Sequence, residues 1–205
     1  MNLYIEGDGF AWKTRSQLSD DPTPITPLAA RLMAIDEGHC KLYLARPCQY
    51  VNDLQCNSDD WSSHRFSPKV VETYREILDQ MKQRYGIESF TLVGYSGGGA
   101  VAVLMAGDRN DIGEIITVAG NLDTDAWVKY HGLSPLDGSI NPSKRAETIS
   151  HIPQMHFIGN EDTTVLKEIF FSYLGACKNP QHIRYRVIES VTHTQGWEKI
   201  WKENR

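Results

Sequence analysis

The sequence is poor in cysteine and lacks long apolar stretches, and its basic residues do not cluster. No uninterrupted run approaches the roughly 18 apolar residues that a membrane-spanning helix needs, and no charged-then-apolar leader is present. Lysines and arginines are scattered, and the formal net charge is -5 at pH 7. We therefore expect neither a membrane-spanning segment nor a nucleic-acid partner.

The four cysteines permit two interpretations. Cys48 and Cys56 lie in one short polar segment, close enough in sequence to form a disulfide in an oxidising compartment. Cys40 and Cys177 lie far apart, and their pairing cannot be deduced from sequence. The alternative is four free thiols in a cytosolic protein, and the two interpretations stay open here. Because no C-x₂-C pair is present, we expect no zinc site. Asp123 and Asp125 could coordinate another cation, but no ligand-spaced motif surrounds them, so a solvated turn is favoured and we expect no metal.

Strand-like and helix-like segments alternate along the 205 residues, which is enough chain for a sizeable core. Strands are expected at 2–6, 41–45, 89–95, 114–119, 153–159 and 181–189. Helices are expected at 26–38, with Thr26 as its cap, at 67–86, directly after Ser96, and near the end of the chain. This order predicts a single α/β domain over 1–205 with a doubly wound, mostly parallel sheet.

A glycine-flanked serine follows the third of these strands. The stretch Gly94-Tyr95-Ser96-Gly97-Gly98 matches G-x-S-x-G, in which a sharp strand-to-helix turn presents a nucleophilic serine. The flanking glycines are needed because the strand and helix cross closely there. One alternative is a glycine-rich strand-to-helix turn without chemistry. The other is a phosphate-binding loop, but the Lys-Ser or Lys-Thr pair that such a loop requires is missing. We therefore predict that Ser96 is a catalytic nucleophile.

The partners of a catalytic serine are expected after later strands. Asp162 follows the strand at 153–159, and His193 follows the last strand. The order Ser96, Asp162, His193 is that of one hydrolase fold and differs from the orders of two well-known protease classes. Asp162 is preferred over Glu161 as the triad acid because the next helix is expected to start just after it. A role as a helix cap is the alternative for Asp162, and the two roles can coexist.

The first strand ends at Gly7-Asp8-Gly9, a glycine-rich turn that allows a close approach of the backbone to a substrate. Together with the amide of Gly97, an amide of Asp8 or Gly9 is expected to form an oxyanion hole. An ordinary turn is the alternative. Because a domain that begins inside its sheet is unusual, either its first strands are missing or a further segment, with an export signal among the possibilities, precedes this one.

An irregular stretch of about thirty residues, 120–152, leaves the carboxyl end of a strand, where such sheets bind ligands. We interpret it as a cap-like insertion over the site. Trp127 and Tyr130 are then candidate pocket walls, together with Phe10 and Tyr95. A partly helical insertion that only packs on the surface is the alternative.

Five motifs carry a resemblance to a known group. They are Tyr4 to Trp12, Ala45 to Val51, Gly94 to Ala102, Thr117 to Asp123, and His193 to Trp197. The chain resembles α/β-hydrolase-fold proteins, and more closely bacterial hydrolases often described as lipoproteins or exported proteins. The resemblance implies the fold, a Ser-His-Asp triad, and a place in the periplasm, cell envelope or medium. It implies little about substrate. Those relatives carry a signal region and more chain before the first strand, so a cytoplasmic location stays open.

The sequence thus favours a serine hydrolase that cleaves a carboxylic ester or thioester through an acyl-enzyme. We expect a small-molecule ester or acyl substrate and no metal or organic cofactor. An acyltransferase with the same triad is the second interpretation, and a non-catalytic envelope binding protein on the same scaffold is the third. The sequence predicts no oligomeric state.

Overall fold

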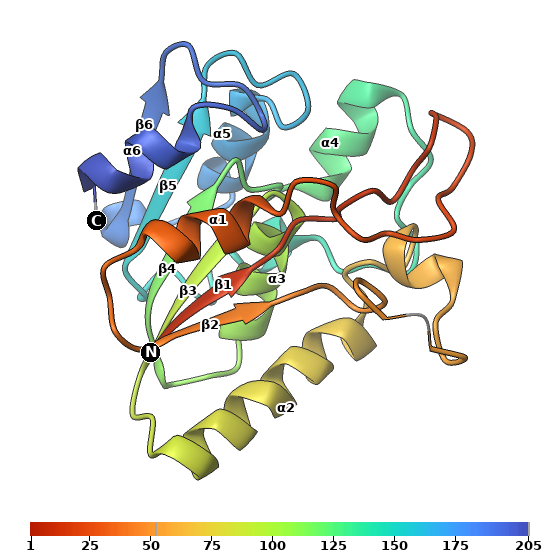
Figure 1. Cartoon of the computed structure of the whole chain (residues 1–205). Helices are drawn as coiled ribbons and strands as arrows, with labels where there is room; N and C mark the ends of the chain where they lie inside the picture. Colours follow the sequence, from red (N-terminus) through yellow and green to blue (C-terminus); the bar gives the residue numbers. More distant parts are fainter. Residues whose placement is uncertain (52, 205) are drawn as a thin grey trace.

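A single sheet of six parallel strands forms the centre of the protein, in the order β2-β1-β3-β4-β5-β6 (Figure 1). The computed structural model describes residues 1–51 and 53–204. The strands are β1 (Asn2–Ile5), β2 (Lys41–Leu44), β3 (Phe90–Tyr95), β4 (Ile112–Val118), β5 (Gln154–Gly159) and β6 (Ile183–Ile188). The α-helices are α1 (Leu28–Ile35), α2 (Pro68–Tyr85), α3 (Gly97–Ala106), α4 (Thr124–His131), α5 (Lys167–Gly175) and α6 (Trp197–Asn204). Short 3₁₀ turns are η1 (Ser58–Trp61), η2 (Pro142–Arg145) and η3 (Pro180–His182).

Helices cover both faces of the sheet, which confirms the predicted doubly wound α/β class (Figure 1). Helices α1 and α6 pack on one face, where Leu32 and Trp201 meet Tyr4 and Val93 of the strands. Helices α2, α3 and α5 cover the other face, whose core includes every apolar side chain of α3. Because both faces are buried, the inner strands read as nearly continuous apolar runs. Strand β6 instead alternates apolar and charged side chains over most of its length, since it lies at the edge of the sheet.

The predicted boundaries of α2 agree with the structure, but the predicted start of α1 is wrong. Ser67 caps α2 by accepting a hydrogen bond from the amide of Val70, and Gly86 ends it with φ of 66°. Helix α1 begins after Pro27, without a side-chain cap. The carboxylate of Glu6 accepts a hydrogen bond from the Ala29 amide instead, so a residue distant in sequence serves the first turn.

Segment 120–152 is folded rather than irregular. It contains α4 and η2, and Asp123 joins them by accepting hydrogen bonds from the amide of Ala126 and the carboxamide of Asn141. Its last part packs into the core through Ala146, Ile149 and Ile152. The insertion is therefore partly helical, and polar side chains within it satisfy its backbone. Only its first part reaches the sheet edge where the strands end.

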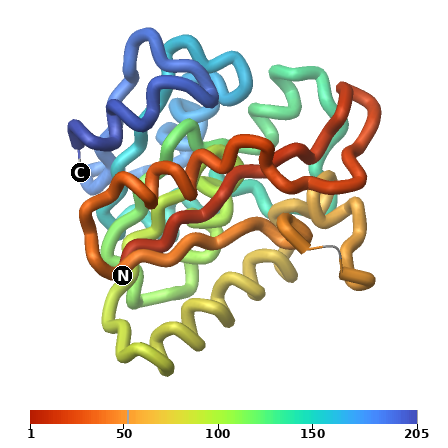
Figure 2. The backbone as a smooth tube through the Cα atoms, in the orientation of Figure 1, coloured from red at the N-terminus to blue at the C-terminus, as the bar shows by residue number. Residues whose placement is uncertain are grey.

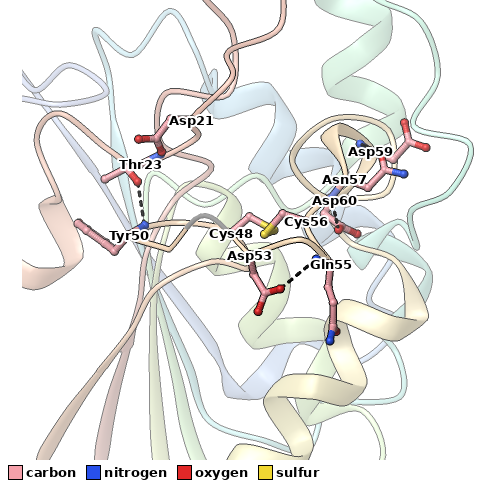
Figure 3. Close-up of a disulfide and its surroundings, with 10 residues drawn as sticks. All are labelled: Asp21, Thr23, Cys48, Tyr50, Asp53, Gln55, Cys56, Asn57, Asp59 and Asp60. Carbon is pink, nitrogen blue, oxygen red and sulfur yellow. Dashed lines mark hydrogen bonds between the residues drawn. A yellow bond between two sulfur atoms is a disulfide. The ribbon is translucent and has the colours of Figure 1, made fainter.

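Two further segments shape that edge. The loop after β1 lies beside α4, and Arg15 Nη2 donates a hydrogen bond to the His131 carbonyl at 3.1 Å (Figure 2). A disulfide joins Cys48 to Cys56, with their Cα atoms 5.7 Å apart (Figure 3). Cys40 is an exposed free thiol, and Cys177 is a buried one. Among the described residues, no helix combines the length and apolar character needed to cross a bilayer.

Candidate active site

Ser96 lies at the junction of β3 and α3 in a backbone conformation that non-glycine residues rarely adopt. Its φ is 51° and its ψ is -120°. A Cβ atom on Gly94 would lie 2.4 Å from the carbonyl oxygen of Gly98, and one on Gly98 would lie 2.2 Å from the carbonyl oxygen of Ile5. Both glycines are therefore required sterically, as the sequence pattern predicts.

The structure brings together the three side chains predicted as a triad. Ser96 Oγ is 3.0 Å from His193 Nε2, and His193 Nδ1 is 2.7 Å from Asp162 Oδ2. His193 lies in the loop between β6 and α6, where its carbonyl accepts hydrogen bonds from Tyr95 Oη at 3.2 Å and Trp197 Nε1 at 2.9 Å. The backbone of the histidine is thus fixed from two sides.

Asp162 lies in the loop after β5, and its side chain is fully buried. Its Oδ1 atom accepts hydrogen bonds from the amides of Thr164 and Val165, both at 2.8 Å, so only Oδ2 faces His193. Helix α5 does not begin until Lys167. The expectation that a helix starts just after Asp162 is therefore wrong, and the carboxylate stabilises a turn instead of capping a helix.

The predicted oxyanion donors lie at the start of α3 and in the loop after β1. Within residues 1–51 and 53–204, no hydrogen bond engages the amides of Gly97, Asp8 or Gly9. Gly9 has φ of 66°, and a Cβ there would lie 2.1 Å from the carbonyl oxygen of Pro22. The Gly7 carbonyl accepts a 3.0 Å hydrogen bond from Gln49 Nε2, which fixes the other end of the loop. These amides remain our predicted oxyanion donors.

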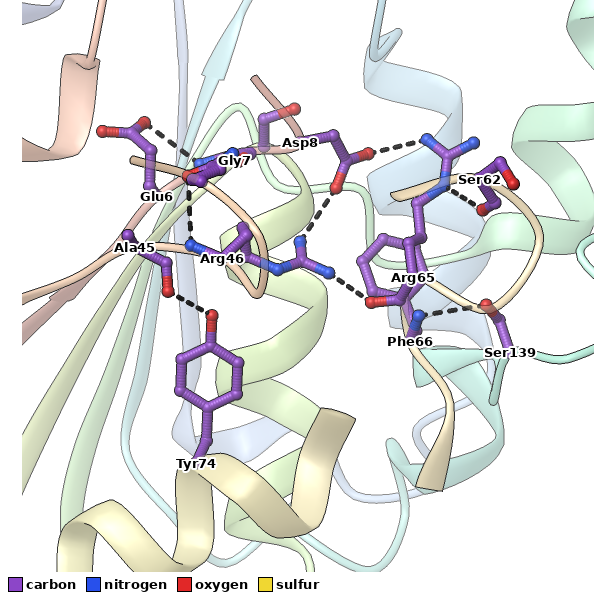
Figure 4. Close-up of polar contacts among 12 residues, drawn as sticks. Glu6, Gly7, Asp8, Ala45, Arg46, Ser62, Arg65, Phe66, Tyr74 and Ser139 are labelled. Atoms are coloured by element: carbon purple, nitrogen blue, oxygen red, sulfur yellow. Dashed lines mark hydrogen bonds and ion pairs between the residues drawn. The ribbon is translucent and has the colours of Figure 1, made fainter. Parts of the chain in front are cut away.

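An ion-pair cluster that the sequence does not predict holds the same loop (Figure 4). Asp8 Oδ1 is 2.8 Å from Arg46 Nη1, and Asp8 Oδ2 is 2.8 Å from Arg65 Nη1. Burial alone would raise the pKa of Asp8, but the charges of Arg65 and Arg46 outweigh it and lower that pKa. The only sequence signal for this cluster is the position of Arg46, two residues after the end of β2.

A cavity of about 380 Å³ opens above Ser96 and His193. Of the predicted pocket walls, Phe10, Tyr95 and Trp127 line it. Tyr130, one turn further along α4 than Trp127, does not line it; its side chain is 61% exposed and contacts the ring of His131. Lining residues that the sequence did not predict include Arg65, Asn121, Trp12 and Ile25.

The polar groups of this region offer no metal site. Within the part of the chain that the structure describes, no group of three or more His, Cys, Asp or Glu side chains could hold a metal ion. Burial raises the pKa of Tyr95, so its hydroxyl stays protonated and serves as the donor to the His193 carbonyl. The arrangement is suited to nucleophilic attack by Ser96 with His193 as its base.

Comparison with known families agrees with this geometry. A family model described as "Serine hydrolase (FSH1)" matches residues 54–193, which is well over half of the chain and includes Ser96, Asp162 and His193. The chain belongs to the FSH1 serine hydrolase family. No curated protein matches its sequence significantly.

Solved structures that resemble this FSH1-family chain share its α/β-hydrolase fold. The Pyrococcus furiosus esterase Pf2001 matches with a TM-score of 0.67 and 15% identity, over 98% of this chain and 78% of that one. In another crystal form of that esterase the match has 19% identity and a TM-score of 0.55, and covers 66% of this chain and only 59% of that one. TT1662 from Thermus thermophilus matches at 16% identity with a TM-score of 0.65, over 100% of this chain and 90% of that one. At such identities the likeness concerns the fold alone.

Proposed function

We propose that this protein hydrolyses a carboxylic ester or thioester through a Ser96–His193–Asp162 triad. The observation that carries the proposal is the pair of hydrogen bonds, 3.0 Å and 2.7 Å, that link the three side chains in this order. Membership of a serine hydrolase family favours an enzyme over a binding protein on the same scaffold. The esterases among the structural relatives make esters the first substrates to test.

In the acylation step, Asp162 accepts the Nδ1–H of His193, which leaves Nε2 unprotonated and facing the serine hydroxyl. Ser96 Oγ forms a bond to the acyl carbonyl carbon while its proton moves to Nε2. The C=O electron pair shifts onto oxygen. When this electron pair re-forms the C=O bond, the bond to the alcohol or thiol breaks, and Nε2 gives its proton to that leaving group.

The developing oxyanion requires preorganised donors. The amides of Gly97 and of Asp8 or Gly9 are the groups we assign to it, since they lack other partners within the described residues. In deacylation, a water molecule gives its proton to His193 Nε2 and attacks the acyl carbon. The ester bond to Ser96 then breaks, Oγ recovers the proton, and a carboxylic acid leaves.

A fluorophosphonate probe tests the nucleophile directly, because it forms a stable adduct only with an activated serine. Peptide mapping should find a single adduct on Ser96, which Ser96→Ala and His193→Ala both abolish. His39→Ala is the matched control, since His39 is exposed and distant from the triad in sequence. Equal labelling of His193→Ala and of His39→Ala would contradict the assignment of the base.

An acyltransferase would use the same triad, and product analysis separates the two activities. We expect free acid as the main product when a 4-nitrophenyl ester is incubated with the protein and a primary alcohol. Predominant transfer to the alcohol at millimolar concentration would instead assign an acyltransferase.

We further propose that the protein works in an oxidising compartment such as the periplasm, the cell envelope or the medium. The pairing of Cys48 with Cys56 supports this location, because disulfides persist where thiols are not kept reduced. Thiol alkylation of protein from its own cells, before any reduction, should leave both cysteines unmodified. Alkylation of both would favour the cytoplasm.

A further inference from the structure

The cluster around Asp8 carries an excess of positive charge. One carboxylate is paired with two guanidinium groups, so the three side chains sum to a net charge of +1 (Figure 4). Both arginine side chains are buried, with 5% and 7% of their surface exposed for Arg46 and Arg65. A buried charge is stabilised by a counter-ion, and within the described residues this cluster has none beyond Asp8.

Of the two arginines in the cluster, Arg65 lines the cavity above Ser96. Its Nε donates to the Ser62 carbonyl at 2.8 Å and its Nη1 to Asp8, but its Nη2 donates to no group in the described part of the chain. The guanidinium also lies over the Trp127 ring, with Cζ 5.6 Å from the ring centre. Three contacts therefore fix this group and leave one donor nitrogen for a ligand.

Asn121 supplies a second unused polar group in the same cavity. Its side chain lines the cavity and the residue is only 3% exposed. Its backbone amide donates to the Ser96 carbonyl at 3.1 Å, which places it next to the nucleophile. Its carboxamide forms no hydrogen bond with any described residue, and Oδ1 is completely buried. The carboxamide Nδ2 likewise has no partner among the described residues, and as a donor it is the atom that an anionic group of a substrate can engage.

Two acidic side chains also line the cavity, and among the described residues only Asp8 forms an ion pair with the arginines. Asp8 is already counted within the cluster. Glu6 is buried, and its carboxyl group accepts hydrogen bonds from the amides of Gly7 and Ala29 and from the Tyr43 hydroxyl. Burial raises the pKa of Glu6, and these hydrogen bonds oppose that rise.

We infer that this cavity binds a carboxylate group of the substrate, with Arg65 as its ionic partner and Asn121 as a hydrogen-bond donor. The inference rests on the proposed hydrolase function and names its substrate class: an ester or thioester that also carries a free carboxylate. A guanidinium group pairs well with a planar carboxylate. One negative charge also balances the cluster, whereas a phosphate monoester would carry close to two. Phe10 and Trp12 at the rim suit an apolar linker.

The test compares two esters that differ in one charge: 4-nitrophenyl hydrogen adipate and its neutral methyl ester. We expect kcat/KM of the wild-type protein to be at least about tenfold higher for the acid, because a charge-assisted hydrogen bond is gained. Arg65→Gln should bring this ratio close to one. General damage to the loop after β1 would lower both rates and leave the ratio unchanged, so the ratio isolates the carboxylate contact.

Three more variants keep the test decisive. Asn121→Ala should lower the ratio several-fold without touching the ion pairs, and Arg65→Lys should retain part of the preference. Arg184→Gln removes an exposed positive charge of the edge strand and is the matched control, with an unchanged ratio expected.

The outcomes separate the two proposals. Hydrolysis of both esters with a wild-type ratio of one or less, or an unchanged ratio in Arg65→Gln, overturns the carboxylate site and leaves the hydrolase standing. Absence of hydrolysis of either ester, together with absence of a fluorophosphonate adduct, overturns the hydrolase and this inference with it.

Discussion

Oδ1 of Asp8 occupies the space that a side chain on Gly97 would need, since a Cβ built on Gly97 lies 2.1 Å from that oxygen. The carboxylate cannot easily move away, because the same oxygen is 2.8 Å from Arg46 Nη1. The residue after the nucleophile and the loop after β1 are therefore in direct contact. A disturbance of either segment is transmitted to the other.

Gly97→Ala should lower kcat by about 100-fold to 1,000-fold, as expected when one oxyanion donor is misplaced. The added methyl group would push Asp8 and its loop away from α3. The measurement is kcat on a 4-nitrophenyl ester, with urea unfolding to verify the fold. Gly175→Ala is the control, since a Cβ there meets no atom within 4 Å. Equal kcat values for the two variants would show that this contact does not position the donors.

Asp162→Asn should lower kcat by about 10⁴-fold, because an amide donor opposite Nδ1 stabilises the wrong tautomer of His193. The amide oxygen can still accept the hydrogen bonds of the Thr164 and Val165 amides, so the turn should persist. Burst and steady-state kinetics on the same ester provide the measurement. Asp125→Asn, at an exposed position, should retain wild-type rates. A loss below tenfold for Asp162→Asn would remove this residue from the triad.

Replacement of both Cys48 and Cys56 by serine should lower the free energy of unfolding by about 2–3 kcal/mol, the value expected for a short closed loop. We also expect a lower kcat, because buried Gln49, next to Cys48, holds the Gly7 carbonyl. Urea unfolding and ester kinetics measure the two effects. Cys40→Ser, at an exposed free thiol, is the control. Unchanged stability of the double variant would mean that the loop is fixed by its other contacts.

Stability should fall as the pH drops below about 6.5, where an unfolded histidine takes up a proton. Burial lowers the pKa of His156 to about 3, so the folded protein binds fewer protons than the unfolded chain between these values. This residue alone then contributes a slope of up to about 1.4 kcal/mol per pH unit. Urea unfolding at pH 7, 6 and 5 should give a flatter profile for His156→Gln than for His39→Ala. Parallel profiles would exclude His156 as the cause.

The parts that the sequence predicted well are those determined by neighbours along the chain. The glycines around Ser96 are required by one strand-to-helix crossing, so a five-residue pattern was sufficient. The short apolar segments between helices likewise predicted the strands. A strand that is buried on both faces has a nearly continuous apolar sequence, which is easy to recognise. The positions of Asp162 and His193 followed from the rule that parallel strands end at one edge.

The features of the fold and site that the sequence did not predict depend on contacts between distant segments. Arg65 meets Asp8 across 57 residues, and no local pattern indicates such a pair. Thr26 is a good cap in isolation, but Glu6, in the loop after β1, accepts the hydrogen bond from the first turn of α1. Tyr130 follows Trp127 by three residues, yet only Trp127 reaches the cavity.

The place of β1 inside the sheet has a consequence for how the chain folds. Asn2 pairs with Lys41 on one side and with Thr91 on the other, so β1 cannot be fully paired until the segment around residue 91 has joined the sheet. All-parallel sheets form slowly because each pairing must close a long loop first. Until those pairings form, the early strands expose apolar surface, and this is the stage at which aggregation competes with folding.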